Sequence, residues 1–370
     1  MAQAIIEDVR VISTDEGYCG WPTVARRANG ELLVVYSGGR EAHVCPYGKV
    51  QCIRSQDDGE TWSGPIQLAD GPLDDRDAGV LETARGTILV NWFTSVAWID
   101  RLHRHEIGQL GRGDHETLLI WSRLRHDLFA AGVNVREQLG DWMLRSTDGA
   151  KTWSSRYATG VNSPHGAVQL GNGHLLYAGK RTSKPDTWWG AGNAHQHSEI
   201  GVSLSTDDGA TWHWQGAIPL AAGHAYDTYH ELHAVEAANG DLIVQIRNAN
   251  PKWESQTLQT ESSDGGSTWS TPHKIGVWGL PSHLLRLADD QLLMTYGYRR
   301  QPFGNLARTS QDHGRTWSAP LVISDDGIGH DLGYPSSAQL ADGRILTVWY
   351  ELVANNPRAV LRQARWRVAS

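Results

Sequence analysis

Short apolar segments alternate along the whole chain with polar turns, most of which contain glycine. Six apolar segments directly follow such a turn, at residues 32–36, 88–93, 175–178, 242–246, 292–296 and 345–350. The turns before them are Asn29-Gly30, Arg85-Gly86, Asn172-Gly173, Asn239-Gly240, Asp289-Asp290 and Asp342-Gly343. Asn-Gly and Asp-Gly between two β-rich apolar runs favour a tight hairpin, because these residues tolerate positive φ. The pattern therefore predicts six β-hairpins.

A second repeat, Ser-x-Asp-x-Gly-x-Thr-Trp, is interleaved with the hairpins. It is complete where it begins at Ser55, Ser205, Ser262 and Ser310, and a fifth copy that begins at Ser146 has its glycine one place early. Asp and Ser side chains bond to nearby backbone groups and hold a turn, and Gly supplies a positive φ. The Trp then packs against a neighbouring strand pair. We interpret each copy as a structural clasp on the outside of the fold, without a catalytic role.

Together the two repeats predict an all-β fold, a six-bladed β-propeller that forms one domain over residues 1–370. Two inner strands, a third strand and a clasp make one blade, and a ring of such blades leaves no long exposed edge. The last blade lacks a clasp of its own. We expect residues 4–12 to complete it beside residues 360–368 and so to close the ring.

Residues 96–140 interrupt the repeat within the second blade. Apolar residues recur at helical spacing over 116–129, so a helix is expected there. The segment carries four histidines: His103, His105, His115 and His126. An insertion of this length is often a lid or a pocket wall, and an oligomer contact is the alternative. A seventh blade hidden in the segment is a further alternative, although hairpin turns are missing from it.

The composition narrows the class of partner. The chain has 370 residues, a net charge of −8 and no basic run, so nucleic acid is not an expected partner. No apolar stretch reaches the roughly 18 residues of a membrane span. No signal peptide is visible, so a cytoplasmic protein is expected, or a secreted one if a leader has been removed. Three cysteines, an odd number, argue against a disulfide framework, and the oligomeric state is left open.

No cofactor is predicted. The glycine-rich stretches match no phosphate-binding loop. His195 and His197 would place both imidazoles on one face of a strand, which makes them the one candidate for a structural metal. His230 and His233 are three residues apart and would point to opposite faces, which disfavours a metal shared between them.

The first inner strand of each blade opens with unusually polar residues. In a propeller these openings surround the central axis, so residues that are distant in sequence are expected to meet there. The openings contain Arg76, His165, Tyr229, His230, Glu231, His233 and Tyr334. His titrates near neutrality and suits proton transfer, Arg binds a carboxylate through paired hydrogen bonds, and Tyr can donate a proton. This pattern favours acid–base chemistry on a carboxylated substrate, and a propeller that only binds glycan or protein is the alternative.

The clasps resemble the Asp boxes of the sialidase-like (neuraminidase-like) propeller superfamily, and the resemblance covers essentially the whole chain. It implies that Glu231 and Arg247, which are sixteen residues apart, belong to a sialidase-type site. It also implies that Tyr334 is a nucleophile, and that Glu351 resembles the acidic residue at the end of the next strand.

The chain departs from the superfamily pattern at two places. Trp21 stands where the first arginine of a carboxylate-binding triad is expected, and His43, in the loop 38–48 that also carries Arg40, stands where an acid/base Asp is expected. The third arginine of the triad would be Arg299 or Arg300.

The loop with His43 and the opening Ser163-Pro164-His165-Gly166 look similar to a narrower group of these propellers, the α-L-rhamnosidases and L-rhamnose-α-1,4-D-glucuronate lyases. This resemblance implies an oligo- or polysaccharide substrate, cleaved at a rhamnose–glucuronate linkage by hydrolysis or by β-elimination. In the hydrolases of that group a single His is catalytic, and His43 would be that residue. An exo-α-sialidase is the alternative.

The expected site residues follow from the openings and the two resemblances. As catalytic groups we expect His43, His165, His230, Tyr229, Tyr334 and Glu231. As substrate-binding groups we expect Arg40, Arg76, Arg247, Arg300, His233, Trp21 and Trp188. The pair Trp188-Trp189 is expected to be a platform for sugar stacking, or else interface packing.

Overall fold

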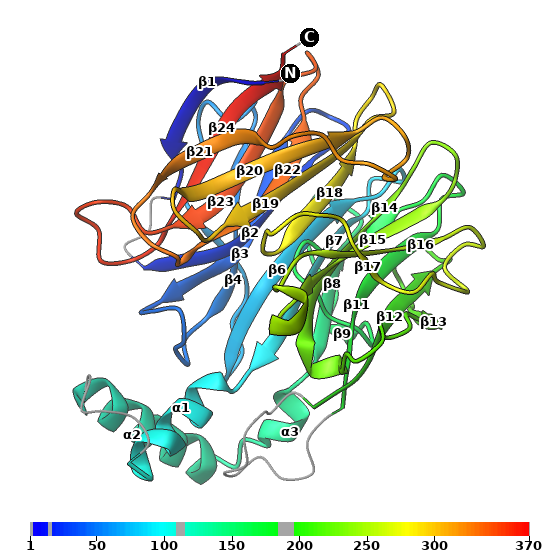
Figure 1. The fold of residues 1–370 in the computed structure, drawn as a ribbon. Helices are drawn as coiled ribbons and strands as arrows, with labels where there is room; N and C mark the ends of the chain where they lie inside the picture. Colours follow the sequence, from blue (N-terminus) through cyan, green and yellow to red (C-terminus); the bar gives the residue numbers. More distant parts are fainter. Residues whose placement is uncertain (1–2, 14–16, 109–114, 184–195, 370) are drawn as a thin grey trace.

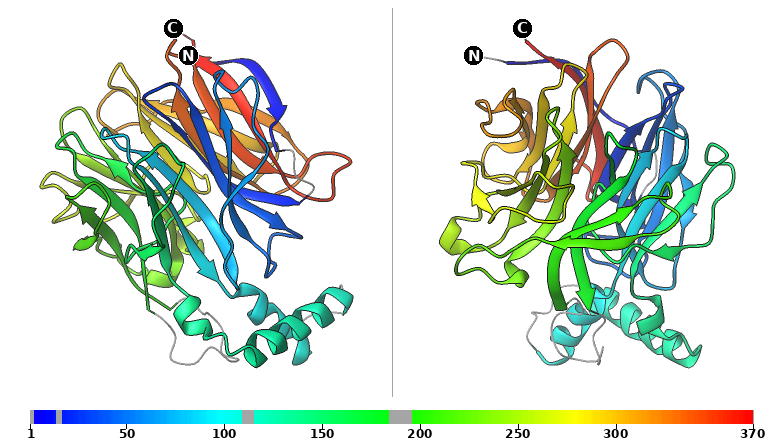
Figure 2. Two further views of the ribbon diagram at one scale, coloured as in Figure 1. Left: turned by 180° about the vertical axis from the view of Figure 1, so that it is seen from behind. Right: turned by 90° about the vertical axis from the view of Figure 1, so that its right-hand side faces the viewer.

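The computed structural model describes residues 3–13, 17–108, 115–183 and 196–369 (Figure 1). The strands form six four-stranded antiparallel sheets arranged around one axis, as the two further views in Figure 2 also show. The predicted six-bladed β-propeller is therefore confirmed, and the described residues of the segment 96–140, namely 96–108 and 115–140, form no seventh blade.

Each blade runs outward from its first strand in sequence order. The first two blades are β2 (Tyr18–Arg26), β3 (Leu32–Arg40), β4 (Lys49–Ser55) and β5 (Ile66–Ala69), then β6 (Asp74–Glu82), β7 (Ile88–Ser95), β8 (Asp141–Ser146) and β9 (Tyr157–Ala158). The next two are β10 (Val168–Gln169), β11 (Leu175–Ser183), β12 (Gln196–Ser205) and β13 (His213–Ala217), then β14 (Tyr229–Glu236), β15 (Leu242–Asn248), β16 (Leu258–Ser262) and β17 (His273–Lys274). The fifth is β18 (Ser282–Arg286), β19 (Leu292–Tyr298), β20 (Phe303–Ser310) and β21 (Leu321–Gly327).

The sixth blade joins the two ends of the chain. Its strands are β22 (Leu332–Gln339), β23 (Ile345–Glu351), β24 (Val360–Val368) and, outermost, β1 (Ala4–Val11). Strand β1 pairs antiparallel with β24, with Ala4 opposite Val368 and Val11 opposite Arg362. The predicted closure of the ring by the N-terminal segment is thus confirmed.

The Ser-x-Asp-x-Gly-x-Thr-Trp clasps form the expected turns. In the first copy Asp57 Oδ1 accepts the Thr61 N–H at 2.9 Å and the Ser55 hydroxyl at 2.8 Å, and Asp57 Oδ2 accepts the Thr61 hydroxyl at 2.6 Å. The clasp also joins two blades, because the Trp62 indole N–H donates to Gln363 on β24 at 2.9 Å. These residues are structural, as their pattern indicates.

The helical insertion lies between β7 and β8 and consists of α1 (Ala97–Glu106), α2 (His115–Ala130) and α3 (Val135–Gln138). The helix expected over 116–129 is confirmed by α2. Figure 1 places these helices beyond the end of the propeller at which β7 ends and β6 begins. Trp98 and Trp121 of the insertion pack in one apolar cluster with Cys45 and Tyr47 of the loop 38–48. The insertion therefore supports the loop that carries His43.

Two short 3-10 helices, Tyr226–Thr228 and Pro251–Trp253, complete the secondary structure. None of the helices in the described ranges is both long and apolar enough to cross a membrane.

Candidate active site

Four inner strands bend where they reach the central axis. Trp21, Asp77, His165 and Tyr334 all have positive φ, between 52° and 70°, at these bends. The strand pairing slips at the same points in three blades, from Gly20 to Thr23, from Arg76 to Gly79 and from Gly333 to Ser336. Non-glycine residues rarely adopt this conformation, and bulges of this kind re-aim side chains and are common beside active sites.

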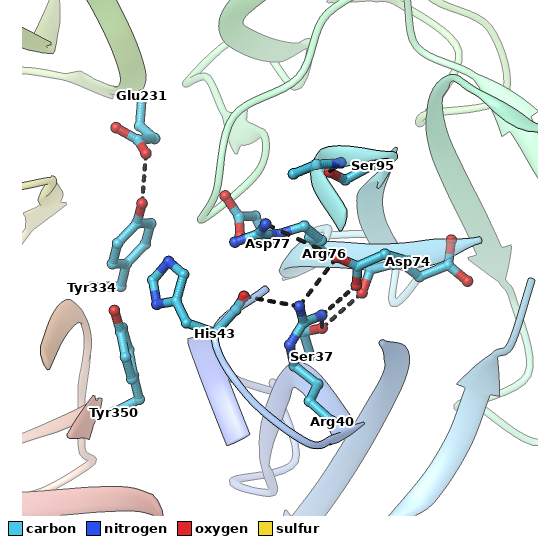
Figure 3. Close-up of polar contacts among 12 residues, drawn as sticks. Ser37, Arg40, His43, Asp74, Arg76, Asp77, Ser95, Glu231, Tyr334 and Tyr350 are labelled. Atoms are coloured by element: carbon cyan, nitrogen blue, oxygen red, sulfur yellow. Dashed lines mark hydrogen bonds and ion pairs between the residues drawn. The ribbon is translucent and has the colours of Figure 1, made fainter. Parts of the chain in front are cut away.

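Tyr334, Glu231 and Arg247 form the centre of the site. The Tyr334 hydroxyl donates to Glu231 Oε1 at 2.5 Å, as Figure 3 shows. Arg247 Nη1 donates to the two Glu231 oxygens at 2.9 and 3.0 Å and to the Tyr334 oxygen at 3.2 Å. These contacts join strands β14, β15 and β22 across the axis.

The electrostatics of this trio favour a neutral phenol beside an ionised carboxylate. Burial opposes the ionised form of Glu231, but Arg247 and His230 hold the pKa of Glu231 well below its usual range. Burial and the Glu231 charge raise the pKa of Tyr334 well above its usual value. Glu231 is therefore ready to accept the Tyr334 proton at the moment when Tyr334 forms a bond.

A second group is centred on Asp331, directly before β22. His43 Nδ1 lies 2.8 Å from Asp331 Oδ1, and the hydroxyls of Tyr18 and Tyr350 each donate to the same carboxylate at about 3 Å. Burial, Arg76 and Arg299 lower the pKa of His43, while Asp331 acts in the opposite direction. Because Asp331 accepts from Nδ1, the second ring nitrogen of the half-exposed His43 can exchange a proton with a substrate.

Trp21 connects the two groups. Its ring centre lies 5.0 Å from that of His43 and 6.4 Å from that of Tyr334. The guanidinium carbons of Arg40 and Arg76 lie 4.8 and 4.3 Å from its ring centre. The indole is buried, with 1% of its surface exposed, so it supports the arginines and offers no stacking surface to a sugar.

Arg40 and Arg76 differ in how firmly they are held. Arg40 is fully buried, forms an ion pair with Asp74 and donates to Ser37 and to the His43 carbonyl at 3.0 Å each (Figure 3). Apart from its contact with Trp21, Arg76 has two long ion-pair contacts with the described residues, 3.9 Å to Asp74 and 4.0 Å to Asp77. Arg40 is a structural cation, whereas Arg76 can turn its guanidinium to a ligand.

Beside Glu231 lies a small pocket of about 130 Å³, lined by Asp77, Phe93, Asn162, Pro164, Lys180, His230 and Glu231. Burial raises the pKa of Asp77 to about 7 and lowers the pKa of Lys180 to about 8. Burial lowers the pKa of His230 to about 4. Asp77 and Lys180, whose charges change near neutrality, therefore line one cavity together with His230, and shifted pKa values of this kind are typical of a catalytic site.

Most of the residues expected from the sequence lie in or beside this arrangement. His43, Tyr334, Glu231, Arg247, Arg76, Arg40, Trp21 and His230 form it, as described above. His165 lies behind Tyr334, with 6.4 Å between ring centres, and His233 lies deeper still, with its ring centre 5.6 Å from that of His165. Trp188, and His195 of the suggested metal pair, fall outside the described residues.

Besides the substrate-binding roles expected for Trp21 and Arg40, three further expectations do not match the geometry. Tyr229 is buried in the apolar cluster between two blades, and its hydroxyl accepts the Ala221 N–H at 3.1 Å. Arg300 lies over Trp278, with 4.1 Å from its guanidinium carbon to the ring centre. Glu351 accepts from the Trp349 indole at 2.7 Å and from Arg362 at 2.6 Å. None of these three side chains contacts the central trio in the described part of the chain.

The structure adds two residues that sequence reasoning missed, Asp331 and Lys180, and it decides between Arg299 and Arg300, which the sequence left open. Asp331 is the most important, and its only signal is its place just before the Gly333-Tyr334-Pro335 opening. Arg299, rather than Arg300, approaches the site, because it donates to the Leu332 carbonyl at 2.8 Å and to the Tyr350 hydroxyl at 3.2 Å. Lys180 carried no signal, since it is a single lysine two positions after an ordinary apolar run within β11.

No group of three or more His, Cys, Asp or Glu side chains within the described ranges has an arrangement suited to a metal ion. The chemistry that this site can carry out with its own residues is proton transfer, nucleophilic attack by a phenol and binding of an anion.

The chain matches known proteins by sequence family and by fold. Residues 127–347 match the family described as BNR repeat-like domain. A protein of unknown function from Dyadobacter fermentans superposes with a TM-score of 0.75, at 22% identity and 99% coverage of both chains.

Two sialidase-type structures are more distant. The NanB sialidase of Streptococcus pneumoniae has a TM-score of 0.63 at 14% identity, over 98% of this chain and 70% of its own. A leech intramolecular trans-sialidase has a TM-score of 0.63 at 14% identity, over 99% and 70%. A comparison with curated proteins finds no similar sequence. By its sequence match the chain belongs to the BNR repeat-like domain family, and its β-propeller fold is similar to that of the sialidase-type structures.

Proposed function

We propose that this protein is a carbohydrate-active enzyme that cleaves the glycosidic bond of an acidic sugar, with Tyr334 as nucleophile. The observation that carries the proposal is the trio in which Tyr334 donates to Glu231 at 2.5 Å and Arg247 holds Glu231 ionised. A side chain that accepts the proton of a nucleophile, and is itself oriented by a third group, is the general signature of covalent catalysis.

A phenol suits a negatively charged sugar. Most glycosidases that retain configuration attack with a carboxylate, and sialidases, which use Tyr, are an exception. A carboxylate nucleophile would be repelled by a substrate that carries its own carboxylate near the reacting carbon, whereas a neutral phenol would not. Tyr334 stays neutral until it reacts, because its pKa is raised well above the usual value.

The cations of the site suit the substrate carboxylate. Arg76 is the least engaged guanidinium, with contacts of 3.9 and 4.0 Å to its acidic neighbours. Arg299 is also near, bound to the Leu332 carbonyl and to the Tyr350 hydroxyl. We assign these two arginines to carboxylate binding, since a planar guanidinium matches a carboxylate with two parallel hydrogen bonds.

The His43–Asp331 pair supplies the second proton. In the first step Tyr334 attacks the anomeric carbon and its proton passes to Glu231, while His43 gives a proton to the leaving oxygen. In the second step His43 takes a proton from water, the water oxygen replaces Tyr334 at the anomeric carbon, and Glu231 returns the proton to Tyr334. Tyr334, Glu231 and His43 all end as they began, and the products are the free acidic sugar and the alcohol of the leaving group.

A screen with fluorogenic glycosides tests this proposal. Methylumbelliferyl glycosides of sialic acid and of D-glucuronic acid would be assayed with the wild type, with Tyr334→Phe and with the control Tyr229→Phe, whose hydroxyl lies outside the site. We expect release from at least one substrate by the wild type and the control, and none by Tyr334→Phe. Full activity in Tyr334→Phe would refute the role of Tyr334.

A second candidate function is β-elimination at a rhamnose–glucuronate linkage. It is favoured by the pairing of His43 with Asp331 and by Trp21 at a position where a sialidase-type site would use arginine. His43 would then take the C5 proton of the uronate, Arg76 would neutralise its carboxylate and Tyr334 would protonate the leaving oxygen. Elimination creates a conjugated double bond, so an increase in ultraviolet absorbance on a rhamnose–glucuronate glycan would select it over hydrolysis. Binding of glycan without any product would instead support a propeller that only binds.

A further inference from the structure

A large cavity lies at the other end of the inner strands from the candidate active site. This rear cavity has a volume of about 660 Å³. Its floor contains the side chains of Thr23, His165, His233, His283 and Ser337, and its mouth is formed by the last residues of the six inner strands. Tyr334, Glu231 and His43 are not among its lining residues.

The six strand ends form a polar ring around the mouth: Arg26, Glu82, Gln169, Glu236, Arg286 and Gln339. Four of them tie adjacent blades together, because each accepts the backbone N–H of the hairpin turn in the preceding blade. Glu82 accepts from Ala28 at 2.6 Å and Gln169 from Ala84 at 2.6 Å. Glu236 and Gln339 do the same for Gly171 and Ala288, at 2.5 and 2.8 Å.

Arg26 and Arg286 depart from this pattern. A guanidinium has no hydrogen-bond acceptor, so it cannot accept the backbone N–H of the preceding hairpin turn. Arg26 Nε is buried and has no hydrogen-bond partner among the described residues. Among the residues that the structure describes, Arg286 pairs with Asp290 of its own hairpin alone, and both side chains are exposed, so the pair is weak. At two of the six positions around the mouth, a cation thus stands in place of a side chain that links adjacent blades.

The floor is built from uncharged histidines. Burial lowers the pKa of His165 and His233 well below the usual value and that of His283 to about 3. His233 and His283 are stacked, with 4.5 Å between ring centres. His233 Nδ1 accepts the Leu284 N–H at 2.9 Å, so its Nε2 carries the proton and is a donor.

His165 carries its proton on the other ring nitrogen, Nδ1. The Thr23 hydroxyl donates to the Ala78 carbonyl at 3.0 Å, so its oxygen is left to accept from His165 Nδ1 at 3.3 Å. His165 Nε2 is then an acceptor, and it is buried with no hydrogen-bond partner in the described part of the chain. His165 is 2% exposed, so a ligand or a water molecule in the cavity is needed to donate a hydrogen bond to this buried lone pair.

We propose that the rear cavity is a second binding site, for a hydroxylated carboxylate the size of one or two sugar rings. A hydroxyl group both donates and accepts, which matches a floor that offers the N–H of His233 and the lone pair of His165. His233 and Glu236 are three positions apart, as are His283 and Arg286, so each strand rises by about 10 Å between the floor and the mouth of the cavity. A ligand of that length would bring its carboxylate to Arg26 and Arg286, while apolar walls such as Val235 and Leu284 contact its C–H faces.

Calorimetric titration with sodium D-glucuronate and with D-glucose at constant ionic strength tests the proposal, since the two sugars differ in the carboxylate. The protein forms would be the wild type, Arg26→Gln/Arg286→Gln and the control Arg101→Gln, an exposed arginine of α1. We expect the double variant to bind glucuronate at least tenfold more weakly than the wild type, the control to bind it equally, and glucose to bind weakly to all three.

Thermal unfolding would verify that the variants are folded. We expect them to be folded, because neither Arg26 nor Arg286 forms one of the hydrogen bonds that link adjacent blades at the mouth. Undiminished binding of glucuronate by the double variant would overturn the proposal, and so would the absence of glucuronate binding to the wild type. Loss of binding in Arg76→Gln together with normal binding in the double variant would place the ligand at the candidate active site. This outcome would overturn the proposal as well. None of these outcomes depends on the proposed glycosidase activity.

Discussion

His43 Nδ1 lies 2.8 Å from Asp331 Oδ1, although 288 positions separate the two residues in the sequence. The same carboxylate accepts the hydroxyls of Tyr18 and Tyr350, at distances of 3.0 and 3.1 Å. Burial acts against the charge, but hydrogen bonds from His43, Tyr18 and Tyr350 keep the pKa of Asp331 below its usual range. An ionised Asp331 therefore fixes the ring of His43 and the position of its Nδ1 proton.

Asp331→Asn is expected to lower kcat by about 10²–10⁴-fold with the fold intact, which is the range for loss of a positioned proton-transfer group. Asp331 acts to raise the pKa of His43, so removal of its charge lowers that pKa further. The limb of the pH–rate profile that reports His43 should therefore move to lower pH. Tyr350→Phe is the control, since it removes one bond to Asp331 and keeps the pair. An unchanged rate and an unmoved limb in Asp331→Asn would contradict the role of the pair.

Glu231→Gln is expected to abolish turnover and also to destabilise the protein. Arg247 is only 21% exposed at its side chain, and without Glu231 its charge would be poorly compensated. Breaking such a partly buried pair costs roughly 2–4 kcal/mol of unfolding free energy, since the remaining charge is left desolvated. Urea unfolding of Glu231→Gln, Arg247→Met and the double variant measures the loss of unfolding free energy in each.

The double variant is the control for the pair, since it removes both charges. It should be more stable than Glu231→Gln alone while remaining inactive. If the two single losses simply added in the double variant, Glu231 and Arg247 would not be coupled, and the electrostatic account of the trio would be wrong.

The fold could be predicted from the sequence, because short repeated motifs specify each of its blades. Turn residues, clasp residues and apolar runs each act within about ten positions, so the blades and the closure by β1 could be predicted. Glu231 and Tyr334 could be named for the same reason, since they stand at repeated strand openings.

The residues that the sequence left open, misplaced or missed depend on features that no local repeat specifies. Arg299 and Arg300 are neighbours that lie at different places, one beside Tyr350 and one over Trp278, and sequence alone does not tell which points inward. Pairing between β14 and β15 slips between Tyr229 and Leu232, which breaks the alternation from which Tyr229 would be placed. Asp331 belongs to no repeat, and only the closed ring brings it to His43.

Asp77→Asn is expected to change how stability depends on pH. Burial raises the pKa of Asp77 from 3.8 to about 7, so between these values the folded protein holds a proton that the unfolded chain has lost. This residue's contribution to the unfolding free energy therefore decreases as pH rises through that window and is constant above it. Asn carries no charge at any pH, so the variant should gain stability relative to the wild type, by roughly 2–4 kcal/mol, between about pH 4 and pH 8. Denaturant unfolding at several pH values measures the difference, and a difference that does not vary with pH would contradict the buried, protonated carboxyl.

Asp208 and Asp58 occupy the same place in two clasps and provide a matched test of contacts between blades. Both have positive φ, 61° and 53°, so replacement by Ala carries the same backbone strain in each. Asp208 is 7% exposed and binds the second blade, with 2.5 Å to the Thr87 hydroxyl and 3.1 Å to Arg145. Asp58 makes no side-chain hydrogen bond with the described residues and is partly exposed.

Asp208→Ala should therefore lower the unfolding free energy by about 2–3 kcal/mol more than Asp58→Ala, because Arg145 and Thr87 lose a buried partner. Urea unfolding monitored by tryptophan fluorescence measures both variants under one condition. Activity should be kept in each, since the clasps lie outside the candidate site. Equal losses of stability would mean that the backbone conformation of the clasp, and not its bond to the neighbouring blade, accounts for the effect of this aspartate.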